Sequence, residues 1–221
     1  MLILLPGIQA GPAEFARLVP LLRREHLVLP LPDSTADRLP DIAAQLDLPA
    51  GEHDFLCASF GGLLAWALPR GRVRSLVTIG TLPSRTEAAE RSGRAGRWLH
   101  RVPGPLFRRW YRDRVRASLE EDSADPELVA SVRLPSPAVL AARLRAIGHW
   151  GLTARPPAPA TWLWGVTDRF VTWDKGSVAA LGMVPEILPG GHRPHLSHPS
   201  LVAAYTGLQG PTRCRRLRVK T

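Results

Sequence analysis

Short apolar segments alternate along the chain with segments of helical pattern, and this alternation most limits the folds available to it. Helical patterns occur at 36–46 and 60–68. An earlier helical pattern has one apolar face, formed by Phe15, Leu18, Val19 and Leu22. Strands that alternate with helices are typically parallel and joined by crossover helices. The sequence therefore predicts an α/β fold with a mostly parallel central sheet and helices on both faces. The predicted strands cover residues 1–5, 26–31, 54–58, 74–80, 161–164 and 185–188.

One long segment interrupts the alternation. Residues 83–150 contain polar and amphipathic helical patterns and no strand pattern. An insertion between two strands at one end of a parallel sheet lies over the carboxyl ends of the strands, where open α/β sheets bind ligands. We therefore expect a helical lid at 83–150 on an α/β core formed by 1–82 and 151–209. The basic tail at 210–221 is expected to be disordered.

The length and composition fit a single domain that carries an insertion. The chain has 221 residues, of which 45% are hydrophobic, enough to bury a core. Cys57 and Cys214 form neither a disulfide framework nor a metal-ligand spacing, which fits a reducing compartment. The opening MLILLPG has no basic region, and its apolar run is too short for a signal peptide or a membrane span. We expect a cytoplasmic protein.

The chain is strongly basic, with a net charge of +10. Much of the excess lies in the expected lid, where residues 85–116 contain ten arginines and three acids. In GPLFRRWYRDRV, apolar and aromatic residues interleave with arginines, so Arg108, Arg109 and Trp110 are candidates for contacting an acidic carrier protein, an acyl phosphate or an anionic membrane surface.

Two plainer explanations of this charge remain open. The segment also fits an ordinary amphipathic lid helix with a solvated basic face. GC-rich codon usage, which replaces lysine by arginine, produces the same excess. Nucleic acid is the weaker option as a partner because no recognised binding motif accompanies the charge.

The hexapeptide CASFGG, residues 57–62, places a serine between a predicted strand and a predicted helix. A serine on such a turn projects as a nucleophile, and the N–H of Phe60 lies at a helix N-terminus, which favours a developing oxyanion. Gly61 and Gly62 allow the strand and the helix to pass closely. Taken alone, Ser59 also fits a small polar residue at an ordinary turn.

An acid and a histidine follow two later strands. Asp168 comes after the predicted strand 161–164 in WLWGVTDRF, where it suits either the orientation of an imidazole or an Asx turn, and Asp174 is a competing acid. His192 lies on a glycine-rich loop after the last strand, whereas His195 and His198 fall on or near the next helix. Three neighbouring histidines also suit a metal, but neither cysteine nor a carboxylate pair accompanies them, so we expect no metal.

Together these motifs resemble the α/β-hydrolase fold superfamily over nearly the full length of the chain. LILLPG is similar to its first ordered strand and the following turn, CASFGG to its nucleophile elbow, WGVTD to its acid turn and GGHRPHLSHPSLV to its histidine loop. The resemblance implies a catalytic triad of Ser59, Asp168 and His192, in the chain order described for these enzymes. It also implies an oxyanion hole formed by the N–H groups of Ile8 and Phe60, and no cofactor.

The function that this resemblance implies is hydrolysis of a small-molecule carboxylic ester or thioester through an acyl-enzyme on Ser59. A serine in the elbow argues against the haloalkane dehalogenase and epoxide hydrolase branches, which attack with aspartate. Two positions depart from the family pattern: Pro6 stands where a histidine is usual, and Cys57 where a glycine is usual. The alternative is therefore a non-catalytic binding protein on the same scaffold, similar to maspardin-like proteins.

Overall fold

The structure is a computed structural model. It describes residues 1–8, 11–81, 87–99, 101–122, 134–150, 156–171 and 184–207, with single residues at 129, 132 and 181. Its centre is a six-stranded sheet in the order β2-β1-β3-β4-β5-β6, in which every neighbouring pair is parallel. The predicted α/β class is confirmed. The strands are β1 (Leu2–Leu5), β2 (His26–Val28), β3 (His53–Ala58), β4 (Val73–Ile79), β5 (Ala160–Gly165) and β6 (Pro185–Leu188).

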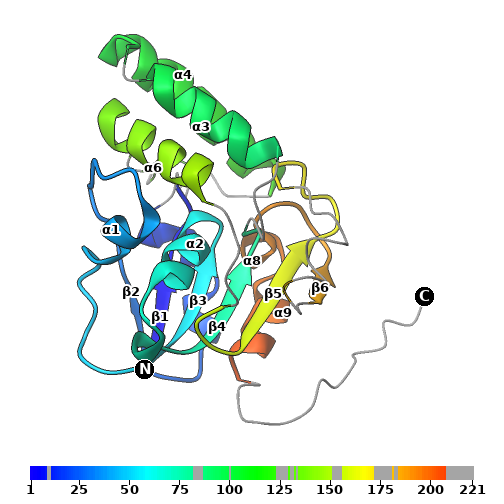
Figure 1. Ribbon diagram of the computed structural model, residues 1–221. Coiled ribbons are helices and arrows are strands. Elements are labelled where there is room, and N and C mark those ends of the chain that lie inside the picture. Colours follow the sequence, from blue (N-terminus) through cyan, green and yellow to red (C-terminus); the bar gives the residue numbers. More distant parts are fainter. Residues whose placement is uncertain are drawn as a thin grey trace.

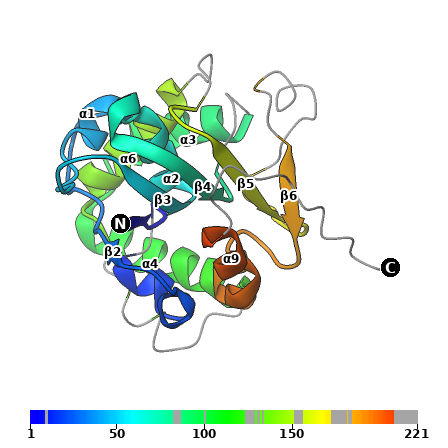
Figure 2. The same ribbon diagram turned by 90° about the horizontal axis from the view of Figure 1, so that it is seen from below.

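Helices cover both faces of this sheet, and further helices lie over its carboxyl end (Figures 1 and 2). Helices α1 (Leu39–Ala43) and α2 (Phe60–Ala67) lie on one face, and α9 (Pro199–Thr206) lies on the other (Figure 2). Between β4 and β5 the chain forms the helical insertion, which lies beyond the carboxyl ends of the strands (Figure 1). Among its described residues, the helices are α3 (Glu87–Leu99), α4 (Gly104–Glu121) and α6 (Pro137–His149).

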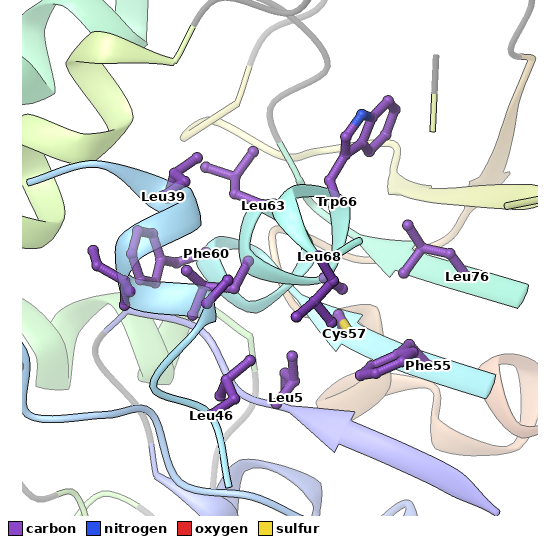
Figure 3. Packing of buried hydrophobic residues seen from close by; sticks show 14 of the residues in the cluster. Leu5, Leu39, Leu46, Phe55, Cys57, Phe60, Leu63, Trp66, Leu68 and Leu76 are labelled. Atoms are coloured by element: carbon purple, nitrogen blue, oxygen red, sulfur yellow. The ribbon is translucent and has the colours of Figure 1, made fainter. Parts of the chain in front are cut away.

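Each strand contributes side chains to two separate cores, because successive residues of a strand point to opposite faces. In β1, Ile3 and Leu5 join the core cluster beneath α1 and α2, whereas Leu2 and Leu4 join the cluster on the opposite face. Figure 3 shows side chains of the first of these clusters, among them Leu5, Phe55 and Phe60. A strand buried on both faces is apolar throughout, which explains why the strands were recognisable as continuous apolar runs.

Three predicted elements are shorter or different in the structure. The strand expected at 26–31 ends at Val28, and the helix expected at 36–46 is limited to Leu39–Ala43. The first helix expected around Phe15 consists instead of the 3₁₀ turns η1 (Pro12–Phe15) and η2 (Val19–Leu21). Pro20 lies within η2, and its lack of a backbone N–H interrupts an α-helix there. The apolar face was nevertheless identified correctly, since Phe15 and Leu18 are fully buried.

Within the helical insertion, α3 packs closely on α6. A methyl group built on Gly93 would lie 2.9 Å from Gly148 Cα, and one on Gly96 would lie 2.7 Å from the Ala141 carbonyl oxygen. Through its residues Ala146 and Ile147, α6 also joins the core cluster beneath α1 and α2. The division of the chain into a core and a lid remains a prediction, and the basic tail at 210–221 lies outside the described residues. No helix in the described part of the chain is both long and apolar enough to span a membrane.

Candidate active site

The carboxyl ends of β1 and β3 form the switch point of the sheet, where the chain turns to opposite sides. Ligand sites of open α/β sheets lie at such points. Leu5 at the end of β1 is in register with Cys57 near the end of β3, so the turn at residues 6–8 runs beside Ser59. A methyl group built on Gly7 would lie 3.6 Å from Ser59 Cβ. The fold thus brings the predicted nucleophile and the predicted oxyanion turn together.

Ser59 has a strained backbone. Its φ and ψ are 47° and −112°, and it is the one non-glycine residue with positive φ in the described part of the chain. Such a conformation costs on the order of 1–3 kcal/mol and persists only where the surroundings enforce it. Here the Ser59 N–H donates to the Ile79 carbonyl at 2.7 Å, and Thr81 Oγ1 donates to the Ser59 carbonyl at 3.0 Å.

Close contacts in the fold explain which residues flank Ser59 in the sequence. A methyl group on Gly61 would lie 2.5 Å from the Leu5 carbonyl oxygen, and one on Gly62 would lie 2.2 Å from Thr81 Oγ1. Both positions therefore need glycine in this arrangement. Cys57 is fully buried among apolar side chains (Figure 3), and burial raises the pKa of its thiol. Its side chain fills the core and is not a second nucleophile.

Asp168 and His192 form a buried hydrogen-bonded pair. His192 Nδ1 donates to Asp168 Oδ2 at 2.9 Å, and the two side chains are 7% and 0% exposed. The other carboxylate oxygen, Oδ1, accepts hydrogen bonds from the N–H groups of Phe170 and Val171 at 2.8 and 3.1 Å. A carboxylate that accepts from Nδ1 leaves Nε2 of the neutral imidazole without a proton and able to accept one.

The end of β4 is the common neighbour of Ser59 and His192. Gly80, which follows β4, has a φ of 55°, and a methyl group there would lie 2.9 Å from His192 Nδ1. Ser59 bonds to Ile79, the residue before Gly80. The elbow and the histidine loop therefore contact adjacent residues at the end of β4.

Two buried side chains hold the turn at residues 6–8, the predicted oxyanion turn. Glu14 Oε2 accepts a hydrogen bond from the Gly7 N–H at 2.6 Å, and Arg143 Nη1 donates to the Ile8 carbonyl at 3.1 Å. Arg143 Nη2 also donates to the Pro32 carbonyl at 3.0 Å. These contacts anchor the turn to η1 and to α6, although Pro6 offers no polar side chain of its own.

Glu14 is a buried carboxylate with basic neighbours. Arg193 Nε lies 3.3 Å from Glu14 Oε1, and His195 Nε2 lies 3.4 Å from the same oxygen, an ion-pair distance. Burial opposes ionisation, but the contact with His195, the charge of Arg193 and the Gly7 N–H outweigh it and lower the pKa of Glu14 to about 2. Glu14 is therefore ionised at neutral pH.

The other candidates from the sequence lie apart from this arrangement. His195 is buried against Glu14, and His198 precedes α9, where its Nδ1 lies 2.9 Å from Ser197 Oγ. Asp174 lies outside the described residues. On α4, the candidate partner-binding residues Arg108, Arg109 and Trp110 are exposed.

Sequence reasoning missed Glu14, Arg143 and Arg193. Two of the three carry a signal in the sequence: Arg143 interrupts the apolar run AVLAARL, and Arg193 directly follows the predicted histidine. A charged residue within an apolar helical run is often a buried one with partners. Glu14 carries no comparable signal.

The amino-acid sequence of this chain matches the alpha/beta hydrolase family. A sequence model of this family matches residues 2–205. The chain belongs to the alpha/beta hydrolase family. Membership confirms the family resemblance and supports an enzyme of the hydrolase type. No curated protein sequence matches the chain.

Solved structures of this family share the fold at low identity. A hydrolase from Pseudomonas aeruginosa PA01 is 18% identical, with a TM-score of 0.73 over 95% of this chain and 89% of the other. An enol-lactonase from Burkholderia xenovorans LB400 is 15% identical, with a TM-score of 0.67 over 93% and 89%. A thioesterase domain from the curacin biosynthetic pathway is 16% identical, with a TM-score of 0.65 over 92% and 89%.

Proposed function

We propose that this protein is a serine hydrolase that cleaves a carboxylic ester or thioester through an acyl-enzyme on Ser59. The observation that carries the proposal is the buried Asp168–His192 hydrogen bond of 2.9 Å at the end of β4, the strand end that also holds the strained Ser59. Nucleophilic catalysis requires a projecting serine and an oriented imidazole, and here both contact the end of the same strand.

In the proposed reaction, Ser59 Oγ attacks the substrate carbonyl while His192 Nε2 takes the hydroxyl proton. Asp168 holds the imidazole tautomer and stabilises the imidazolium that forms. The backbone N–H groups of Ile8 and Phe60 bind the tetrahedral oxyanion, and His192 returns the proton to the departing alcohol or thiol. Water activated by His192 then attacks the acyl-enzyme and releases the acid and free Ser59.

Two considerations support the assignment of roles. The Gly7 N–H is occupied by Glu14, which leaves the next N–H, that of Ile8, as the donor from this turn. Two structural relatives are named as a thioesterase domain and an enol-lactonase. Both names indicate acyl chemistry, the broad class to which cleavage of the proposed substrates also belongs.

Hydrolysis of p-nitrophenyl acetate and labelling by a fluorophosphonate test the proposal. We expect wild-type protein to turn over the ester and to carry the label on Ser59, as mapped by mass spectrometry. Ser59→Ala should lose the label and most of the turnover, by roughly 10⁴-fold or more. Absence of both turnover and label in the wild type would favour the alternative, a non-catalytic binding protein, whose partner binding should survive Ser59→Ala.

We also propose that the basic surface of α3 and α4 attracts an acidic acyl carrier or an acyl group bearing phosphate. Arg94, Arg97 and Arg101 are exposed on or just after α3, as are Arg108, Arg109 and Arg112 on α4. Trp98, Leu106 and Trp110 are 64%, 64% and 50% exposed among them. Exposed aromatic and apolar side chains beside arginines are typical of surfaces that bind acidic partners.

A further inference from the structure

A buried carboxylate fixes the peptide that the proposed oxyanion hole uses. Glu14 is 1% exposed and accepts from the Gly7 N–H at 2.6 Å. Arg143 is 4% exposed and donates to the Ile8 carbonyl at 3.1 Å. The peptide unit that carries the Ile8 N–H lies between these two anchored groups. Its direction is therefore determined from both sides.

The same carboxylate links this turn to the histidine loop and to the helical insertion. Arg193, which follows His192, lies with Nε 3.3 Å from Glu14 Oε1. Its Nη1 donates to Ser118 Oγ at 2.8 Å and to Asp122 Oδ2 at 3.1 Å, at the end of α4. Gly7, Glu14, Arg193 and Asp122 thus form one continuous buried chain of polar contacts.

We infer that Glu14 is a positioning residue which, through the Gly7 N–H, aims the Ile8 N–H at the oxyanion of the tetrahedral intermediate. The inference rests on the proposed function. An ionised acceptor suits this task because its hydrogen bonds are shorter and stronger than those of a neutral one. Pro6 adds nothing polar to the turn, so the support comes from Glu14 on one side and Arg143 on the other.

The test compares Glu14→Gln with Asp54→Asn. Glu14→Gln retains the length of the side chain and an acceptor oxygen, but removes the charge that faces Arg193. Asp54 is the matched control because it too is a buried carboxylate bound by arginines, Arg24 and Arg74. It lies at the start of β3, whereas Ser59 follows the end of that strand.

Three quantities separate positioning from stability: kcat and KM for p-nitrophenyl acetate, and the inhibition constant of phenylboronic acid, which forms a tetrahedral anionic adduct with serine. A full oxyanion donor is worth about 10²–10³-fold in kcat. We expect Glu14→Gln to lower kcat by at least about tenfold and to raise the inhibition constant by a similar factor, with KM within about threefold. Asp54→Asn should leave all three within about twofold of the wild type.

A folded Glu14→Gln protein with wild-type kcat and boronate affinity would overturn the inference. If that variant does not fold, the wild type decides by NMR: the Gly7 amide proton should resonate downfield and exchange slowly with solvent, and exchange as fast as that of an exposed turn would contradict the inference. Wild-type protein that neither hydrolyses the ester nor takes the fluorophosphonate label would refute the proposed function. The Gly7 amide would still report whether Glu14 holds the turn.

Discussion

At the scale of single residues, the Asp168 carboxylate has two separate tasks. Oδ2 accepts from His192, and Oδ1 accepts from the backbone N–H groups of Phe170 and Val171. An asparagine can keep the second task through its carbonyl oxygen, but its NH₂ group cannot accept a hydrogen bond from the Nδ1–H. Replacement by asparagine therefore separates the role in catalysis from the role in the loop.

We expect Asp168→Asn to lower kcat for p-nitrophenyl acetate by about 10⁴-fold, because the imidazole then prefers the wrong tautomer. The midpoint of thermal unfolding should change by only a few degrees, because the loop keeps its bonds to Oδ1. Steady-state kinetics and a thermal melt measure the two effects. A kcat within tenfold of the wild type would mean that Asp168 does not orient the proposed base.

Glu14 makes the stability of the protein depend on pH in the acid range. Its pKa is about 2 in the folded protein and 4.5 ordinarily. Between these values the unfolded chain binds more protons than the folded one, so the stability from Glu14 is complete above about pH 4.5 and is lost as the pH falls towards 2. Glu14→Gln should therefore reduce the slope of the free energy of unfolding against pH in this window.

Urea unfolding between pH 2.5 and 6 measures that slope. Asp54→Asn is the comparison, because Arg74, Ser75 and Arg24 outweigh the effect of burial and hold the pKa of Asp54 well below its usual range. Each variant should remove its own part of the acid dependence, and the double variant should remove both. A Glu14→Gln slope equal to that of the wild type would show that Glu14 is not an ionised group in the folded protein.

At the scale of elements, the elbow depends on a close approach between α2 and β1. The space at Gly61 is closed by backbone atoms of Leu5 and Pro6, which lie within 2.6 Å of a methyl group built there. Backbone atoms cannot turn aside as a side chain can. The contact between the start of α2 and the end of β1 thus leaves no room for a Cβ atom.

Gly61→Ala should lower the free energy of unfolding by about 2–3 kcal/mol, the cost of overpacking a close contact. It should also reduce labelling of Ser59, since the helix that carries the Phe60 N–H must shift. Gly71→Ala is the control: a methyl group there meets nothing within 4 Å. Urea unfolding of both variants checks the prediction, which fails if Gly61→Ala is no less stable than Gly71→Ala.

The sequence predicted the strands better than the contacts between them. Continuous apolar runs identify strands buried on both faces, and the positions of Ser59, Asp168 and His192 relative to strand ends followed from those runs. The bracing of residues 6–8 could not be predicted, because residues far apart in the chain come together there only after folding. Arg143 reaches the Ile8 carbonyl, and Arg193 reaches Glu14, which holds the Gly7 N–H. The 3₁₀ turns around Phe15 were missed because an apolar face of that length does not distinguish them from an α-helix.

At the scale of the whole molecule, the helical insertion is attached to both layers of the fold. Its α6 contributes Ala146 and Ile147 to the core cluster beneath α1 and α2, and the end of α4 is bound by Arg193 beside the histidine loop. Figure 2 shows α3 and α6 on the side of α1 and α2, and α4 on the side of α9. The arginines of α3 and α4 thus belong to an insertion that also donates, through Arg143 of α6, to the carbonyl of Ile8 in the proposed site.

Reversing two of these charges tests whether the basic surface acts on substrates. We expect Arg108→Glu combined with Arg109→Glu to raise KM for an anionic or carrier-bound acyl substrate, more at low salt than at 1 M salt, where the Debye length is about 3 Å. Turnover of neutral p-nitrophenyl acetate should stay within a few-fold of the wild type. Steady-state kinetics at two ionic strengths measure both effects, and equal losses on the two substrates would show that the arginines only support the fold.

The strained backbone of Ser59 lowers the stability of the folded protein at the residue that the proposed reaction requires. Ser59→Gly should relieve about 1–3 kcal/mol of backbone strain, and the extra conformational entropy of glycine in the unfolded chain should offset less than that. The midpoint of thermal unfolding should therefore rise by about 2–4 °C, while turnover disappears. Ser59→Ala keeps the strain and serves as the control for loss of the hydroxyl. Stability alone would favour glycine at this position, so the proposed nucleophile is present at the expense of stability.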